Sequence, residues 1–158
     1  MRRVWALFIF TAVTSLKAEK PFEFPTTPGK LPKHIRPIEY AIRIQPDLAK
    51  LTFSGSETVQ LSVESPTRQI VFNAFDVSVT EARIDENLIA SSAVKADTKN
   101  ELVTLSLPEE LQHGQHTLAL KFNGKINQFG RGLYYVKYQE QGTGAKKLLL
   151  GTQFEATD

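Results

Sequence analysis

Metal binding is the first chemistry to test, because the chain has three histidines, His34, His113 and His116, and no cysteine. His113 and His116 lie three residues apart, a spacing that could bring both rings to one zinc ion if the segment were a helix. Gly114 separates them and a strand-like run begins directly afterwards, so the spacing predicts a loop. The chain has no HExxH motif. We therefore expect structural or solvent-facing histidines, and a zinc hydrolase reaction cannot run from these residues.

Nucleophilic catalysis and phosphate binding also lack candidates. The chain has no GxSxG motif and no cysteine nucleophile. Gly130-Arg131-Gly132 and Gly142-Thr143-Gly144 are glycine-rich, but neither opens a helix whose first amides could bind an anion. We interpret both segments as turns.

Tyrosines are concentrated in one segment, residues 131–138. Strand alternation would place Tyr134 and Tyr138 on one face and Tyr135 on the other. An aromatic platform for a sugar is one interpretation of this segment. Packing of amphipathic rings in the core and at strand edges is commoner, and we favour it.

The elements around these residues have the period of two that is typical of strands. Tyr40, Ile42 and Ile44 share one face of a half-buried strand that ends at Pro46-Asp47. A second alternating stretch runs from Leu51 to Val63, with a bulge expected at Gly55.

Further strand-like runs follow at short, regular intervals. They cover residues 69–75, 77–84, 88–90, 94–96, 102–107, 117–122, 133–138 and 147–150. The segments between them favour tight reversals: residues 85–87, 98–100, 123–124 and 142–144. Only Pro108 to Gln112 suggests a helical turn, which Gly114 would stop. Many short strands without intervening helices predict an all-β domain, an antiparallel β-sandwich or saddle.

The N-terminus has the three parts of a secretory signal. Met1-Arg2-Arg3 precedes the apolar run Val4 to Val13, and a polar stretch with a small-residue exit ends at Ala18. The apolar run is half as long as the roughly 20 residues that a membrane-spanning helix needs. We expect cleavage near Ala18, no stable membrane span, and a secreted, periplasmic or extracellular location.

Composition divides the remainder into two parts. Residues 19–33 contain four prolines and predict an extended lead-in, and residues 34–158 predict one β-rich domain. Removing residues 1–18 lowers the Lys+Arg count from 19 to 16 against 17 Asp+Glu, so the formal charge changes from +2 to −1. The basic character therefore belongs to the export signal, and we do not expect a nucleic-acid partner.

Four passages, in this order and spacing, resemble the N-terminal domain of the aminopeptidase N-like zinc metallopeptidases of the gluzincin clan. The last of them is closest to the puromycin-sensitive type. The passages are Leu31-Pro32-Lys33-His34-Ile35-Arg36-Pro37-Ile38-Glu39-Tyr40 with Ile42 and Ile44, Phe53-Ser54-Gly55, Gly132-Leu133-Tyr134, and Thr152-Gln153-Phe154-Glu155-Ala156-Thr157-Asp158. The resemblance covers residues 31–158.

The resemblance implies roles for two residues. Gln153 matches a glutamine that lines the pocket for the first side chain of a peptide substrate, and Glu155 matches an acid that meets the free α-amino group. Without the resemblance, a polar loop residue and a solvated strand-end acid are the simpler interpretations. A carboxylate in a partly desolvated pocket does, however, bind an ammonium group more strongly than in water. Phe154, between them, should point away from the pocket.

The resemblance also implies a larger parent protein. Its catalytic domain, with HExxH zinc ligands and a peptide substrate, would lie after Asp158, and this chain alone would be inactive. An exposed apolar face near Phe154 should then mark where the next domain docks. The alternative is a stand-alone secreted β-sandwich that binds protein or carbohydrate.

Overall fold

The protein folds into antiparallel β-sheets over the residues that the structure, a computed structural model, describes, namely Gly29 and residues 31–153. The predicted secretory signal and most of the lead-in lie outside this range. The elements, in chain order, are β1 (Ile35–Asp47), β2 (Thr52–Val63), β3 (Thr67–Asn73), β4 (Val77–Ile84), β5 (Asn87–Leu88), the 3-10 turn η2 (Ser91–Ala93), β6 (Val94–Asp97), β7 (Leu102–Leu111), β8 (Gly114–Lys125), β9 (Gly132–Gln139) and β10 (Lys146–Gln153). The all-β prediction is confirmed.

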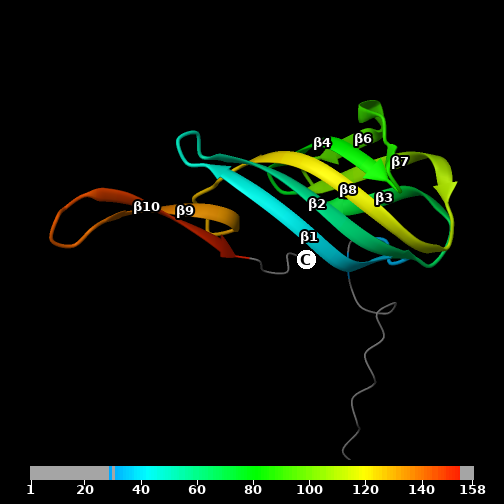
Figure 1. Cartoon of the computed structure of the whole chain (residues 1–158), viewed down its shortest axis with the longest axis horizontal. Coiled ribbons are helices and arrows are strands. Elements are labelled where there is room, and N and C mark those ends of the chain that lie inside the picture. The colour runs from blue at the N-terminus through cyan, green and yellow to red at the C-terminus, as the bar shows by residue number, and fades with distance from the viewer. Residues whose placement is uncertain (1–28, 30, 154–158) are drawn as a thin grey trace, which may run out of the picture.

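The strands form three sheets (Figure 1). The largest has the order β1-β2-β8-β4-β5, a second has the order β3-β7-β6, and β9 and β10 form a separate two-stranded sheet. Every strand pair is antiparallel. The β9–β10 hairpin extends away from the other two sheets (Figure 1).

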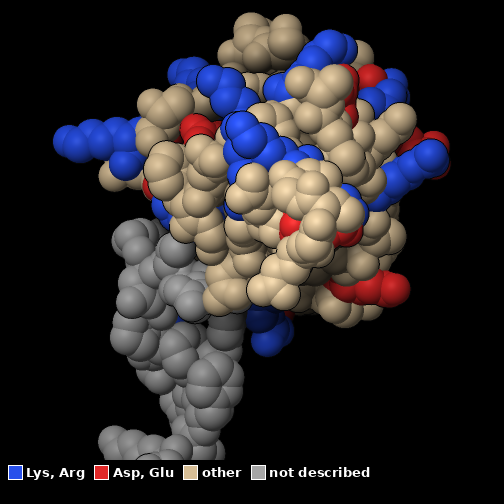
Figure 2. Space-filling model, turned by 90° about the vertical axis from the view of Figure 1, so that its left-hand side faces the viewer, with Lys and Arg blue, Asp and Glu red and all other residues tan. Residues whose placement is uncertain are grey.

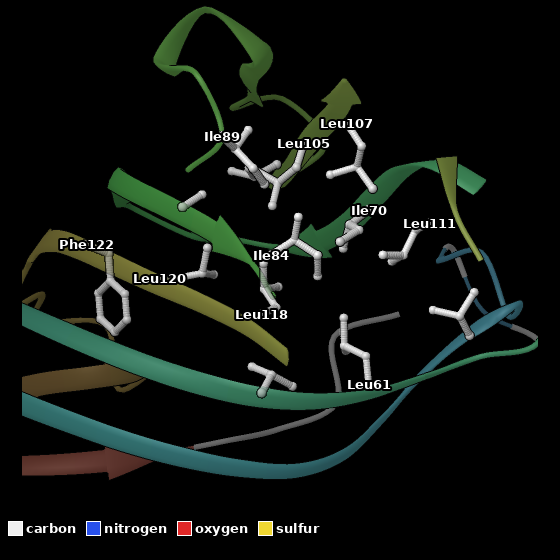
Figure 3. Close-up of a cluster of buried hydrophobic side chains, with 14 of the residues drawn as sticks. Leu61, Ile70, Ile84, Ile89, Leu105, Leu107, Leu111, Leu118, Leu120 and Phe122 are labelled. Carbon is white, nitrogen blue, oxygen red and sulfur yellow. The ribbon is translucent and has the colours of Figure 1, made fainter. Parts of the chain in front are cut away.

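The core lies between the five-stranded and the three-stranded sheets. Leu105 and Val63 have no exposed surface, and Val103 is 2% exposed. Figure 3 shows side chains from both sheets converging, among them Leu61 and Leu118 on one side and Ile70 and Leu107 on the other. Alternation places every second residue of β2, β7 and β8 in this layer, which is why the period of two was visible in the sequence.

Two glycine predictions are wrong for one shared reason. Gly55 makes no bulge and Asn123-Gly124 makes no turn, because both glycines lie inside continuous strands. In the β2–β8 pairing Phe53 is opposite Gly124 and Gly55 is opposite Phe122. A Cβ atom on Gly55 would lie 2.6 Å from Phe122 Cζ, and one on Gly124 would lie 2.6 Å from Phe53 Cε1. Each glycine therefore makes room for the ring across from it.

The predicted helical turn at 108–112 is also wrong. Pro108 lies within β7, which continues to Leu111. Strand β6 pairs only with Leu102–Leu105, and the β3–β7 register shifts around Arg68, whose guanidinium donates to the Pro108 carbonyl at 3.2 Å. Proline is accepted in a sheet at such an irregular, unpaired position.

Strand β1 differs from its prediction in burial. It pairs with β2 along its length, but all residues between Ile35 and Asp47 are exposed. Tyr40, Ile42 and Ile44 are 55%, 58% and 41% exposed. The alternation was correctly recognised, but the expected half-burial was wrong.

Candidate functional site

Gln153 is the last residue of β10, and it pairs with Gly132 at the start of β9. Thr152 is opposite Leu133, and Gly151 is opposite Tyr134. Two passages that the sequence separates by about twenty residues, Gly132-Leu133-Tyr134 and Thr152-Gln153, are therefore neighbouring strands at the base of one hairpin.

The two faces of the hairpin have different surroundings. Leu133, Tyr135 and Leu150 are partly buried and pack against the main core. Gln153 belongs by alternation to the opposite face, together with Tyr134, and it is exposed.

Tyr134 fixes the chain beside Gln153. A Cβ atom on Gly151 would lie 2.8 Å from Tyr134 Cζ, so the ring occupies the space that a side chain at 151 would need. Tyr134 and Tyr135 thus have packing roles, as favoured from the sequence, whereas Tyr138 is 46% exposed.

Asn127 organises the turn that leads into β9. Its Nδ2 donates to the Arg131 carbonyl at 2.6 Å, and its Oδ1 accepts from the Phe129 amide at 2.7 Å. Its backbone forms a parallel bridge with Tyr134, and its carbonyl accepts from the Tyr135 amide at 2.8 Å. Gly130 and Gly132, with φ of +66° and +61°, complete a turn that few other residues could adopt. Asn127 was not predicted from the sequence, although asparagine commonly bonds to the backbone of turns.

Arg131 ties this turn to the sandwich. Its guanidinium forms an ion pair with Glu101, with Nη1 to Oε1 at 3.0 Å, and lies 4.1 Å from the centroid of the Phe75 ring. Glu101 is the last residue of the β6–β7 turn, so the base of the hairpin is held to the three-stranded sheet. The Gly-Arg-Gly segment is a turn, as predicted, but the anchoring role of its arginine was missed.

Comparison with known proteins agrees with this arrangement. Residues 36–158 match the family described as "Peptidase M1 N-terminal domain". The chain belongs to this family. Similar proteins are Aminopeptidase M1-D of Oryza sativa subsp. japonica (38% identical over 82% of the chain), Aminopeptidase N of Acetobacter pasteurianus (33% over the whole chain) and Aminopeptidase M1 of Arabidopsis thaliana (37% over 82%). The aligned part covers 15%, 45% and 15% of these three relatives, respectively.

Glu155 and Phe154 lie outside the described residues of this M1 N-terminal domain, as does the rest of the terminal passage after Gln153. Their predicted roles stay predictions. Gln153 has a position compatible with a pocket wall, because it is exposed at the end of a strand whose base is fixed by Asn127 and Arg131.

Of the histidines of the M1 N-terminal domain, His116 lies within β8 rather than in a loop. Its Nδ1 is 2.6 Å from Asp85 Oδ2 and its Nε2 is 2.9 Å from the Gln112 carbonyl. Both ring nitrogens of His116 are therefore engaged by oxygen atoms of the domain itself. Over residues 31–153, no three His, Cys, Asp or Glu side chains gather closely enough to hold a metal ion.

Charges on the hairpin end of the domain are mixed. Figure 2 faces this end and shows Lys and Arg side chains separated by uncharged residues, with acidic side chains among them. Lys147, for example, pairs with Glu140 across the β9–β10 turn. In the described part of the chain, no helix is long and apolar enough to cross a membrane.

Proposed function

We propose that this chain is the non-catalytic N-terminal domain of an exported zinc aminopeptidase, and that it supplies part of the pocket for the first residue of a peptide substrate. The observation that carries the proposal is the family match over residues 36–158, with aminopeptidases among the similar proteins. The pairing of Gly132 with Gln153 supports it, because it joins two of the passages that resemble the family.

In this proposal Gln153 contacts the side chain of the substrate's first residue and Glu155 binds its α-ammonium group. An enzyme that removes terminal residues must recognise one cation at one fixed point. A carboxylate in a site from which water is excluded gains strongly from such a pair. Fixing the amino end also fixes the distance to the peptide bond that will be cleaved.

Zinc does not fit the described residues, because His116 is engaged at both nitrogens and no other donor cluster is present among residues 31–153. In this proposal the zinc ligands belong to the part of the parent enzyme outside this chain, as the family resemblance implies. The role proposed for the chain is binding and positioning, and no step through the metal is assigned to it. Export rests on the predicted signal at residues 1–18, with secretion or a periplasmic location as its consequence.

The test uses the longer protein expected from the parent gene, assayed on peptides with free and with acetylated amino ends. Glu155→Ala should lower kcat/KM for free peptides about 30-fold or more, since removing one partner of a desolvated charge pair costs roughly 2–5 kcal/mol. It should leave kcat/KM unchanged for acetylated peptides, which are already poor substrates. Gln153→Ala should alter the preference for the first side chain.

The matched control is Thr152→Ala, next to Gln153 but on the other face of β10, and it should behave like the wild type. A parent reading frame without HExxH would overturn the assignment as an aminopeptidase. Equal activity of Glu155→Ala and wild type on free peptides would overturn the pocket role.

A further inference from the structure

On one face of the five-stranded sheet, burial changes between two neighbouring strands: β2 carries buried side chains there, and β1 carries exposed ones. Tyr40, Ile42 and Ile44 of β1 are opposite Val59, Glu57 and Gly55 of β2, so these side chains share one face. Val59 is 4% exposed and belongs to the core, whereas Ile42 is 58% exposed. The three-stranded sheet therefore covers β2 but leaves the same face of β1 open.

This uncovered strip is unusual for an edge strand. Three large apolar side chains lie at every second position along β1, where isolated edge strands normally carry charges or irregularities. Single exposed apolar residues are common on any protein, but an aligned set next to the core is typical of an interaction surface.

Glu57 adds a charge to the strip. It lies on β2 between Gly55 and the buried Val59 on the inner face, and it is half-buried. Within residues 31–153 no cation or hydrogen-bond donor contacts its carboxylate. Burial raises the pKa of Glu57, and burial together with the nearby Glu57 charge raises the pKa of Tyr40. A cation placed beside a half-buried carboxylate would offset the cost of removing its charge from water.

We propose that Tyr40, Ile42, Ile44 and Glu57 form a docking surface for the part of the parent aminopeptidase that lies outside this chain, and that this part places an arginine or lysine against Glu57. The inference rests on the proposed function. The aligned chain covers only 15% to 45% of the similar aminopeptidases, so most of each relative is available to supply the occupant.

A second copy of this chain fits the surface less well. The strip has no lysine or arginine of its own, because Arg36 and Arg43 pair with Ser62 and Ser56 on the opposite face of the sheet. A two-fold contact through the strip would bring Glu57 near its own symmetry mate and supply no cation. The occupant must therefore differ in chemistry from the strip.

The first experiment compares Ile42→Asn with Ala41→Asn, neighbouring exposed positions on opposite faces of β1. Asparagine is used because an aspartate at 42 would lie directly opposite Glu57 and repel it. In the 158-residue chain both variants should melt within about 2–3 °C of each other, since neither side chain is buried. In the longer protein Ile42→Asn should lower the melting temperature by about 5 °C or more, while Ala41→Asn should not.

The second experiment uses Glu57→Gln, which should lower the melting temperature of the longer protein but not that of the 158-residue chain. In the 158-residue chain the substitution removes an unpaired, half-buried carboxylate and should raise the melting temperature or leave it unchanged. In the longer protein it breaks the proposed ion pair and should lower it. The same sign in both proteins would contradict the cation.

The outcomes separate docking from catalysis. If the longer protein cleaves peptides but Ile42→Asn behaves like Ala41→Asn, the docking surface is wrong and the aminopeptidase assignment stands. If Ile42→Asn, but not Ala41→Asn, destabilises a longer protein that lacks peptidase activity, docking stands and the activity is wrong. A 158-residue dimer that Ile42→Asn dissociates would identify a second copy as the occupant and overturn the proposal.

Discussion

At the scale of single residues, His116 and Asp85 form the clearest charged pair with a structural role. Asp85 Oδ1 also accepts the Thr117 amide at 2.9 Å, and His116 reaches the Gln112 carbonyl. The pair therefore connects the β4–β5 turn to the β7–β8 turn. Desolvation lowers the pKa of His116, but its bonds to Asp85 and Gln112 outweigh this effect and raise it. Desolvation raises the pKa of Asp85, but His116 and the Thr117 amide outweigh this and lower it.

These shifts give a direction to the pH dependence. Because the folded-state pKa of His116 is raised, its contribution is complete below the ordinary histidine pKa and is lost as pH rises through the folded value. The Asp85 contribution is lost only as pH falls through its lowered pKa. The free energy of unfolding of wild type should therefore exceed that of His116→Gln by about 0.5–1 kcal/mol at pH 5.5 and by less at pH 8.5.

Urea unfolding at the two pH values measures this difference. Gln115→Ala, at an exposed position beside His116 in β8, changes no titrating group; it is the control and should cost the same at both pH values. A His116→Gln cost that does not change with pH would mean that folding does not shift the pKa of His116.

At the scale of elements, the reciprocal Phe–Gly pairs hold β2 and β8 in register. The two rings meet edge to face, with centroids 6.3 Å apart and planes at 78°. Both phenylalanines are 9% exposed, so neither ring can move into solvent without losing core contacts. Gly124→Ala should therefore destabilise the protein by about 1–3 kcal/mol, the usual cost of overpacking.

The control for this prediction is Asn123→Ala, an exposed neighbour in the same strand. A double-mutant cycle with Phe53→Ala should show that most of the Gly124→Ala cost disappears once the ring is removed. An additive cycle would mean that backbone entropy, and not the ring, determines the need for glycine.

The strands were predictable from the sequence because core-facing and outward-facing residues alternate along them. This alternation is a local property of the chain. The turns at Asp85 and Gly142 were predictable for the same reason, since aspartate and glycine tolerate the positive φ angles found there. Gly55, Gly124 and Pro108 were misread because their surroundings depend on partner strands about 40 to 70 residues away. The exposure of β1 depends on which sheet covers it, and no local pattern encodes that.

The candidate site was predictable only in part. Gly142 and Gly144 between two strand-like runs indicate a hairpin, and this hairpin brings Gln153 to Gly132. The anchor of the hairpin was not predictable, because Glu101 and Arg131 lie thirty residues apart and meet through the packing of different sheets.

At the scale of the whole molecule, the β9–β10 hairpin is a separate sheet whose base is held to the sandwich by the Arg131–Glu101 ion pair. Strands β9 and β10 pair with each other and not with the sandwich, and two strands alone are marginally stable in water. Leu133, Tyr135 and Leu150 provide their apolar contact with the core, and Arg131 provides the polar one. The position of Gln153 therefore depends on contacts at the base of the hairpin.

Arg131→Met should loosen this hairpin without unfolding the sandwich. It keeps apolar contact with Phe75 but removes the ion pair to Glu101, so amide hydrogen exchange in β9 and β10 should accelerate roughly threefold to tenfold while exchange in β2 and β8 stays unchanged. Lys146→Met, at an exposed position at the far end of the same hairpin, is the control and should leave both regions as in wild type. Uniform acceleration across all strands would instead show that the hairpin and the sandwich open as one cooperative unit, and that the position of Gln153 is fixed by global stability rather than by this anchor.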